Sequence, residues 1–493
     1  MTGSSVAAGA ATVVAGGLLA IGIAVTNGLS PTWMILAVLG GLTCVAIVWS
    51  GEIVNMLLYG LVLTAPIAIT KSISARGGVY APGLELSLVD VFLMCLVIVW
   101  AVQLAVYRQR VHAPPPGVGV VLAIFAWAWV SGLFAEDRVA GVLAAINQTK
   151  FLLEFVVLYN LVSTPRVLRR VLIAAGLGLV LNLAMMAAQT IARSPLAVQG
   201  AKVSNSGIRL VYAAADTVRA FRPSGFLLHP NSCADYLVIV LPVPFLLVLL
   251  GKARVGRATW WASALLAAGG ATGLILTMSR GGWISFAVAM MFALFVAIRR
   301  GLLRTRDVVA AGAAAAVAAA VLLSLYPSVI YRITMDDNRS TETRLVMMDQ
   351  AALIIRDNAL LGVGLANYTR ASHRYTPKSF APLPPEYQDT IRAGVVHNGY
   401  LLLWAERGIV GLVLHLLVFV TSLLRFVSIR QWCDEQLHAV ATGLLAGVVG
   451  QGTFYLFDHF YLDLRPGVFW LLLGLVASVL RIQARQTLAV STC

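Results

Sequence analysis

Nine residues in this chain are of types that could bind and act on a charged substrate. In chain order they are Arg222, Ser279, Arg280, Gly281, Gly282, Arg344, His397, Asn398 and Tyr400. Arginine offers planar, bidentate recognition of phosphate, and histidine is the commonest general base near neutral pH. The combination predicts an anionic ligand held by arginine, with a histidine beside it that can accept a proton.

Each of these residues also has a plain structural interpretation. Arg280 follows an apolar run and precedes two glycines, so it could be an interfacial arginine beside a helix end. The same glycines, which lack a Cβ, would let a bulky ligand approach the backbone closely. Asn398 is a plausible helix N-cap, with His397 as a solvated neighbour. The residues alone leave both interpretations open.

Composition places the chain in a membrane. Hydrophobic residues make up 59% of it and charged residues 12%, and the mean hydropathy is +0.86. A soluble protein carries roughly a quarter charged residues, so a soluble fold is excluded. The five cysteines are scattered without CxxC or Cys/His ligand spacing, so we expect neither a disulfide framework nor a zinc site.

Apolar segments of about 20 residues predict an all-α integral membrane protein with about 14 transmembrane helices, within a range of about 12–14. The first segment is expected to be retained as a helix rather than cleaved as a signal peptide. The expected spans are 7–26, 32–50, 53–70, 86–106, 117–135, 144–162, 167–190, 230–250, 258–278, 283–298, 308–326, 398–424, 437–456 and 466–482.

Short basic connections recur on alternate sides of these spans, which orients the chain by the positive-inside rule. Both termini are then expected in the cytoplasm, and the net charge of +15 does not point to nucleic acid. The predicted organisation has helices over 1–190, a long outer loop over 191–229, helices over 230–326, a larger outer loop over 327–397, and helices and a tail over 398–493. The outer loops are rich in arginine, which could be simply solvated and paired or could hold an anion.

The larger outer loop has a helical pattern of its own. Apolar residues spaced as on one helical face begin after a potential N-cap at Thr341. That face consists of Leu345, Met348, Ala352, Ile355 and Ala359. We expect a helix lying across the outer mouth, with Arg344 in its opening turn. The proline-rich segment 376–385 predicts a mobile lid or coil.

Several other polar residues have structural roles by expectation. Asn231 is expected to cap the span that begins at 230. Lys150 and Glu154, spaced i,i+4 within a span, predict an intramembrane ion pair. Asp458 could pair with Arg465 across an outer turn.

Taken in order, these motifs resemble the O-antigen ligase/polymerase superfamily over roughly residues 220–475. The matching features are the Gly-x-x-x-His-Pro-Asn stretch ending at Asn231, Ser279-Arg280-Gly281-Gly282-Trp283, Arg344, Gly362-x-Gly364, His397-Asn398-x-x-Leu401, Glu406-Arg407-Gly408 and Gly411. One departure is the absence of a proline before the Gly-x-Gly turn, where this chain has Asn358-Ala359-Leu360-Leu361. The departure weakens the match to a particular subgroup and leaves the fold unaffected.

The resemblance implies a bacterial inner-membrane glycosyltransferase of surface polysaccharide assembly, active at the periplasmic or external face. Its donor would be a glycan on undecaprenyl diphosphate, and its acceptor a sugar hydroxyl of a glycan or glycolipid. Arg280 and Arg344 would stabilise the departing diphosphate, and His397 would act as base in a metal-independent, inverting displacement with no cofactor. Arg222, Ser279, Gly281, Gly282, Asn398 and Tyr400 would bind substrate. The choice between ligase and polymerase stays open, with the long loops leaning slightly towards polymerase.

A secondary transporter or lipid-linked oligosaccharide flippase is the alternative. The number of expected spans suits a transporter, and Asp90, Lys150 and Glu154 could line a path. Transporters usually have paired repeats and broken helices near the membrane midplane. The two halves of this chain show no such similarity, and its reactive side chains gather at one face.

Overall fold

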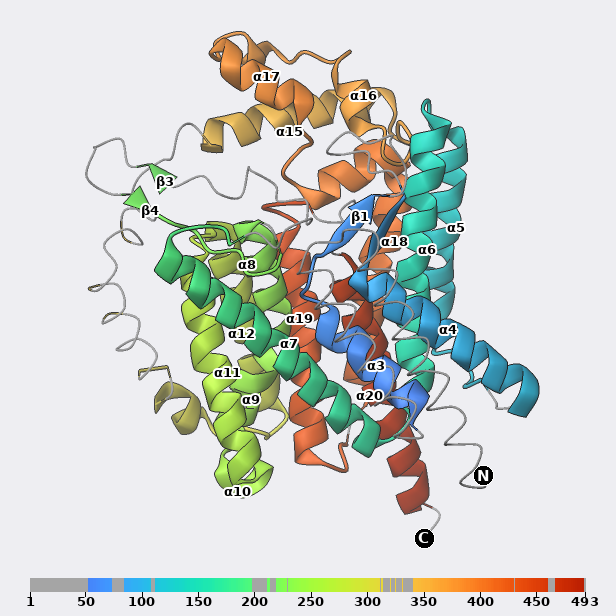
Figure 1. Ribbon diagram of the computed structural model, residues 1–493, viewed down its shortest axis with the longest axis vertical. Coiled ribbons are helices and arrows are strands. Elements are labelled where there is room, and N and C mark those ends of the chain that lie inside the picture. Colours follow the sequence, from blue (N-terminus) through green and yellow to red (C-terminus); the bar gives the residue numbers. More distant parts are fainter. Residues whose placement is uncertain are drawn as a thin grey trace, which may run out of the picture.

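The computed structural model shows a bundle of long helices with a smaller helical layer above one end (Figure 1). It describes residues 52–72, 84–107, 111–196, 211–212, 219–227, 229–310, 340–429, 431–459 and 466–491, with isolated positions between 312 and 330. The expected spans 7–26 and 32–50 lie outside these residues, as does most of 308–326 and of the first outer loop.

The bundle is built mainly from apolar helices that follow most of the expected spans closely. They are α3 (Ile53–Thr64), α4 (Leu88–Tyr107), α5 (Val118–Phe134), α6 (Arg138–Leu161), α7 (Pro165–Ala192), α8 (Pro230–Val240), α9 (Pro242–Leu250), α10 (Lys252–Val255), α11 (Arg257–Leu276), α12 (Arg280–Arg299), α18 (Gly399–Ser428), α19 (Glu435–Phe454) and α20 (Pro466–Ser491). The expected span 53–70 is a helix only over 53–64, and the four-residue α10 lies in a basic connection between two spans. Two small antiparallel hairpins join β1 (Thr70–Ser72) to β2 (Glu85–Ser87) and β3 (Val211–Tyr212) to β4 (Arg219–Ala220).

Length and composition identify these helices as membrane spans. In the described part of the chain, nine are long and apolar enough to cross a bilayer, with α8 and α9 counted together, and α3 and α5 are shorter apolar helices. An α-helix suits a membrane because its backbone polar groups are hydrogen-bonded within the segment itself. The predicted all-α membrane class is therefore confirmed. The total of about 14 spans, which includes segments outside the described residues, stays a prediction.

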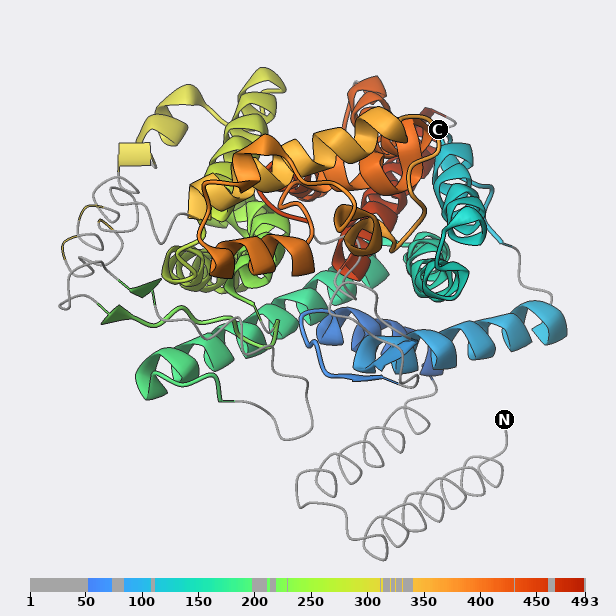
Figure 2. The ribbon, with the colours of Figure 1, turned by 90° about the horizontal axis from the view of Figure 1, so that it is seen from above.

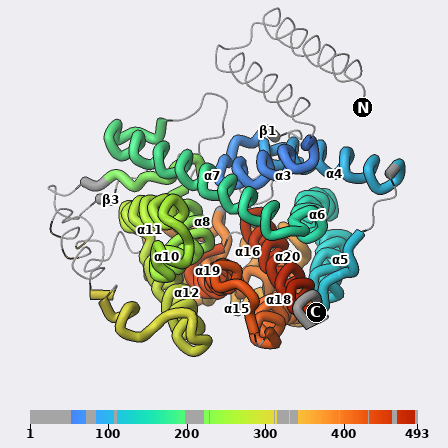
Figure 3. The backbone as a smooth tube through the Cα atoms, turned by 90° about the horizontal axis from the view of Figure 1, so that it is seen from below, coloured from blue at the N-terminus to red at the C-terminus, as the bar shows by residue number. Residues whose placement is uncertain are grey.

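Two C-terminal helices occupy the centre of the bundle. In both α19 and α20, 83% of the most apolar window is buried inside the protein, against 17% in α4 and 28% in α12. Figure 3 shows α19 and α20 ringed by the other helices when the molecule is seen from below. The segment that follows α19 therefore begins at the end of a central, well-packed helix.

The layer above the bundle is made by the larger outer loop. It contains α15 (Ser340–Asp357), α16 (Tyr368–Ser372), the 3₁₀ turn η2 (Lys378–Phe380) and α17 (Pro385–Ala393). Seen from above, α15 runs across the end of the bundle, and α17 lies beside it (Figure 2). The predicted helix across the mouth is present, although it begins one residue before the expected cap at Thr341.

The face by which α15 packs differs from the predicted one. Leu345 is 58% exposed and Ala352 is also exposed, whereas Val346, Ala351 and Ile354 are buried. The true face includes a polar residue, Gln350, whose amide donates to the carbonyl oxygens of Ser372 and Tyr375 at 3.0 and 2.9 Å. The predicted face is right at Ile355, which is buried, and at Met348, which packs against the same cluster, and it is wrong at Leu345 and Ala352.

The proline-rich segment is irregular between residue 376 and the start of α17, apart from the 3₁₀ turn η2, and it is packed against the rest of the layer. Phe380 and Leu383 are 3% exposed each and join an apolar cluster with Val346 and Ile391. Pro385 occupies the first turn of α17, where proline lacks only an N–H that has no helical partner. The prolines of this segment therefore shape turns and a helix start around buried anchors.

A glycine turn of the outer layer is locked onto α18. Glu406, fully buried, accepts hydrogen bonds from the backbone N–H groups of Ala366 and Tyr368, both at 3.0 Å. Its own carbonyl accepts from the N–H of Gly364 at 2.9 Å. Arg407, the next residue, is also buried, with 1% of its surface exposed. The glycine turn and the Glu406 motif, which lie about 40 residues apart in the sequence, thus form one joint between the outer layer and α18.

The predicted ion pair between Lys150 and Glu154 is wrong, because Lys150 pairs with a different carboxylate. Lys150 Nζ lies 2.9 Å from Asp90 Oδ2, at the start of α4. Asp90 also accepts from the N–H of Ser87 at 2.7 Å. Glu154 is 2% exposed and packs beside Gly467 of α20. Spacing along one helix missed a partner supplied by another helix.

Gly408 should be the least replaceable residue of this joint. Its φ of 65° and ψ of −176° fall in a region that is almost restricted to glycine, and a Cβ there would overlap the carbonyl oxygen of Leu360. Gly408→Ala should therefore lower stability by clearly more than the roughly 1–3 kcal/mol of backbone strain alone. Thermal unfolding of the purified protein in detergent measures the effect.

Gly251→Ala is the matched control, because Gly251 has a similar backbone conformation (φ 89°, ψ 157°) with no atom within 4 Å of an added Cβ. Equal losses for the two variants would show that the close approach of α18 to Leu360 is unimportant.

Candidate active site

The candidate active site is organised around Asp458, four residues beyond the end of α19. This carboxylate is 4% exposed and is approached by side chains from three other parts of the chain. They come from the residue before the α18 cap, from the first turn of α8 and from α15. The segment is held in place by the N–H of Gly399, which donates to the carbonyl oxygens of Tyr455 at 2.7 Å and Asp458 at 3.1 Å.

His397 forms a hydrogen-bonded pair with this carboxylate. Its Nδ1 lies 2.9 Å from Asp458 Oδ1, and its side chain is 32% exposed. An ionised carboxylate only accepts hydrogen bonds, so Nδ1 must be the donor. The neutral ring then carries its lone pair on Nε2. A carboxylate that fixes the tautomer in this way leaves Nε2 able to take a proton from a substrate.

The second oxygen of Asp458 connects the site to the first outer loop. Asn231 Nδ2 donates to Asp458 Oδ2 at 2.8 Å, and Asn231 Oδ1 accepts from Arg222 Nη2 at 2.9 Å. Arg222 Nε also donates to the carbonyl oxygen of Thr277 at 2.8 Å, just before the Ser279 motif. The two hydrogen bonds that it donates thus hold the Arg222 side chain beside the predicted site.

The predicted helix cap at Asn231 is wrong. The N-cap of α8 is His229, whose Nδ1 accepts from the N–H of Asn231 at 3.1 Å. Pro230 takes the first helical position, where it fits without strain. Asn231 is released from capping and instead bridges Arg222 and Asp458. The expectation for Arg465 as partner of Asp458 falls outside the described residues.

Arg344 reaches the same segment from above. Its Nη1 donates to the carbonyl oxygen of Phe457 at 3.2 Å. Burial acts to raise the pKa of Asp458, but the charge of His397 and the hydrogen bond with it, together with His459 and Arg344, hold that pKa well below its ordinary value. The carboxylate therefore stays ionised while buried, which requires this set of donors and positive charges.

The Ser279 motif packs directly against this segment. Ser279 is the N-cap of α12 and accepts from the N–H of Gly282 at 3.3 Å. A Cβ on Gly281 would lie 2.7 Å from Cβ of Phe457, and one on Gly282 would lie 2.7 Å from Cβ of Ala234. Both glycines therefore allow close helix packing. Arg280 opens α12 next to Gly281, half-buried at the same end of the bundle.

Asn398 and Tyr400 have clear structural duties. Asn398 is the N-cap of α18, and its side chain accepts from the N–H groups of Tyr400 and Leu401 at 3.1 and 3.0 Å. The hydroxyl of Tyr400 donates to the carbonyl oxygen of Gly452 at 2.6 Å. These bonds explain the two residues without a substrate, and a binding role for either stays a prediction.

The sequence motifs did not identify three residues as members of the candidate site, namely Asn231, Asp458 and His459. The ring of His459 lies 5.3 Å from that of His397, centroid to centroid. Donor atoms of His397, Asp458 and His459 all lie within 4.8 Å of one another, a grouping that could hold a metal ion. The available signal was an adjacent Asp-His pair immediately beyond a predicted span, at the face that carries His397.

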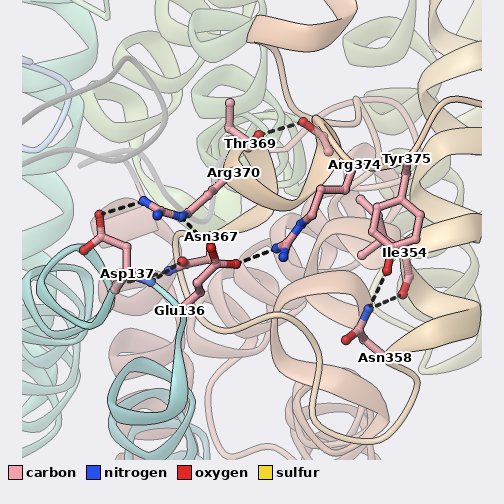
Figure 4. A network of polar contacts seen from close by, with 10 residues as sticks. Glu136, Asp137, Ile354, Asn358, Asn367, Thr369, Arg370, Arg374 and Tyr375 are labelled. Carbon is pink, nitrogen blue, oxygen red and sulfur yellow. Dashed lines mark hydrogen bonds and ion pairs between the residues drawn. The ribbon is translucent and has the colours of Figure 1, made fainter.

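A separate network ties the outer layer to the bundle, as Figure 4 shows. Glu136, between α5 and α6, accepts from Arg370 Nε at 2.9 Å and from Arg374. Hydrogen bonds from these two arginines lower the pKa of Glu136. The N–H of the adjacent Asp137 donates to Asn367 Oδ1 at 2.8 Å. Arg370 and Arg374 of the outer loop therefore have a structural role, because they hold the outer layer against the bundle.

The described residues thus form a helical membrane protein with histidine, carboxylate and arginines gathered at one end. Comparison with known families agrees with the resemblance in the sequence. The family described as O-antigen ligase matches residues 262–416, which include α12, the outer layer and the first half of α18. The resemblance to the O-antigen ligase/polymerase superfamily is confirmed over these residues. No curated protein matches the chain.

The low pKa of Asp458 predicts how the protein responds to acid. A carboxylate whose pKa is lowered by folding adds stability that is fully present above its unfolded pKa, near 3.8, and that disappears as pH falls through the folded value. Asp458→Asn should therefore be less stable than wild type at pH 7, by about 3 kcal/mol. The difference should shrink below pH 4 in thermal unfolding measured between pH 3 and pH 7.

Asp349→Asn is a suitable control, since Asp349 is an exposed carboxylate of α15 that accepts from Ser379 at 2.6 Å. A stability difference between Asp458→Asn and wild type that stays constant down to pH 3 would contradict the assignment of Asp458 as ionised in the folded protein.

Proposed function

We propose that this protein transfers a glycan from undecaprenyl diphosphate to an acceptor sugar hydroxyl at the outer face of the bacterial inner membrane. The observation that carries the proposal is the His397–Asp458 pair, set among Arg222, Arg280 and Arg344. The family match over 262–416 supports a reaction of the ligase/polymerase type. Both termini would lie in the cytoplasm, so that the arginine-rich outer layer faces the periplasm or exterior.

In the proposed reaction, the acceptor hydroxyl oxygen attacks the anomeric carbon of the donor sugar. Its proton moves to Nε2 of His397, and the resulting imidazolium is stabilised by Asp458. The bond between the anomeric carbon and the diphosphate oxygen breaks, and its electron pair leaves with the diphosphate. A new glycosidic bond of inverted configuration and undecaprenyl diphosphate are the products.

The arginines would act on the leaving group. Charge grows on the diphosphate as the glycosidic bond breaks, and fixed cations at that position stabilise the transition state. Arg344 and Arg222 are each held by a backbone carbonyl, Phe457 and Thr277 respectively, which limits the freedom they lose on binding. Arg280 joins them from the start of α12. The donor's isoprenoid tail would lie among the helices below.

Turnover of His397→Ala tests the assigned base. The wild-type protein, reconstituted in nanodiscs with a carrier-linked oligosaccharide, should form a longer glycan or transfer it to an added acceptor. His397→Ala should lower this turnover by roughly 10²–10⁴-fold, the usual range for general acid–base catalysis, with donor affinity nearly unchanged. Asn398→Ala is the matched control, and should lose about 1 kcal/mol of stability as a helix cap while keeping most turnover.

Three results would change this assignment. Loss of donor affinity in His397→Ala would make His397 a phosphate ligand. Wild-type turnover that disappears with a chelator and returns with a divalent cation would make His397, Asp458 and His459 a metal site. Absence of product with any acceptor would contradict the function itself, whereas chain growth without a separate acceptor would identify a polymerase.

Replacement of the arginines tests the diphosphate contact. Arg280→Ala and Arg344→Ala should abolish transfer and leave folding near normal. Arg280→Lys should restore little activity if the contact is bidentate, because lysine carries a point charge instead of a planar fork. Arg356→Ala is the control, since Arg356 is on the exposed end of α15 and pairs with Asp357 at 2.9 Å. Full transfer by both alanine variants would leave these arginines with structural roles alone.

A further inference from the structure

Two adjacent leucines lie exposed in the turn that follows α15. Leu360 and Leu361 are 70% and 62% exposed. Their turn is closed by the N–H of Gly362, which donates to the carbonyl oxygen of Asn358 at 2.9 Å. A single exposed leucine is ordinary, but an apolar patch that continues into further exposed apolar surface marks a site of interaction.

The leucine turn is held against the kink of α18. The carbonyl oxygen of Ala359 accepts from the N–H of Ile409 at 2.9 Å and from Nε1 of Trp404 at 3.0 Å. Gly408, the non-helical residue of the kink, lies so close to Leu360 that an added Cβ would overlap its carbonyl oxygen. The two leucines therefore lie beside the point at which α18 resumes a regular helix.

From that point α18 presents a stripe of exposed apolar side chains at helical spacing. They are 37–63% exposed and consist of Val410, Val413, Leu417, Val420, Leu424 and Val427. From residue 410 to residue 427 the stripe is roughly 26 Å long, close to the hydrocarbon thickness of a bilayer, about 30 Å. Val410 thus marks one edge of the hydrocarbon, and the leucine turn lies at that edge.

Charged residues begin immediately on the other side of the leucines. Arg356 and Asp357, at the end of α15, form an ion pair at 2.9 Å with side chains that are 71% and 43% exposed. Charged side chains are costly in hydrocarbon. The boundary between hydrocarbon and water therefore crosses the chain between Asp357 and Leu360.

The end of α5 changes character beside the same turn. Phe134 is 80% exposed, whereas Glu136 is part of the exposed network of Figure 4 and pairs with Arg370 at 2.9 Å. Ala135 lies between them, and a Cβ added to Gly364 would lie 2.4 Å from its Cβ. Two segments in contact thus pass from exposed apolar to exposed charged residues, as the edge of a hydrocarbon layer requires.

We propose that Leu360 and Leu361 are inserted among phospholipid acyl chains, in the leaflet at the end of the bundle where His397 lies. Lipid is the occupant because the leucines continue the exposed stripe of α18 and are bounded by charge. Backbone groups near hydrocarbon must be bonded within the protein, and the bonds to Ala359 and from Gly362 meet this condition at both ends of the turn. The outer layer is then supported by the membrane itself.

Photocrosslinking of the full-length protein in vesicles of phosphatidylethanolamine and phosphatidylglycerol tests the insertion. A benzophenone amino acid in place of Leu361 should become attached to a phospholipid on irradiation, because benzophenone reacts with neighbouring C–H bonds. Intact-mass spectrometry detects the added lipid. The probe at Val413, on the α18 stripe, is the positive control. The probe at Ala352, exposed on α15 one turn before Arg356, is the negative control and should give a several-fold lower yield.

Thermal unfolding should be unchanged by the probe at Leu361, because that side chain is exposed. A lipid yield at position 361 as low as at position 352, with position 413 labelled, would overturn the insertion. Attachment to a second copy of the chain or to another protein in place of lipid would overturn the assigned occupant. The readout is contact with lipid, so failure of the proposed transfer reaction would leave it unaffected.

Discussion

Burial of one ionised carboxylate at the end of a membrane bundle constrains the whole face of this protein at which His397 lies. Asp458 is 4% exposed, and an unpaired charge in such a place would be strongly unfavourable. The side chains that satisfy it come from separate helices, His397 before α18 and Asn231 in α8. Each helix must therefore end at a defined height, so the carboxylate sets the register of the bundle at this face.

The same constraint explains why the site is built at helix ends rather than in the long loop. His397 stands before an N-cap, Asp458 follows a central helix, and Arg280 opens α12. Helix ends within a packed bundle hold side chains more precisely than loops can. The outer layer contributes Arg344 from above and is itself tied down, through Glu406 on α18 and Glu136 between α5 and α6.

Much of the fold could be predicted from the sequence, because the forces that determine it are local. Apolar length identifies a membrane span, and the described helices follow the expected spans. His397 and Arg344 could be selected because their residue types stand out against an apolar background. Contacts between distant segments could not be predicted in the same way. Asn231 looked like a cap, Lys150 looked like the partner of Glu154, and Leu345 and Ala352 looked like members of the packed face of α15 although both are exposed.

Asp458 was missed for a related reason. In the sequence it stands alone at a turn, where an acidic residue is ordinary, and its nearest cation seemed to be Arg465. Its hydrogen-bond partners are a histidine 61 positions earlier and an asparagine 227 positions earlier. Only packing of α8, α18 and α19 brings those groups together. A histidine in a predicted outer loop is therefore best judged by the carboxylates that other span ends place at the same height, and here an Asp-His pair beyond a central helix supplies one.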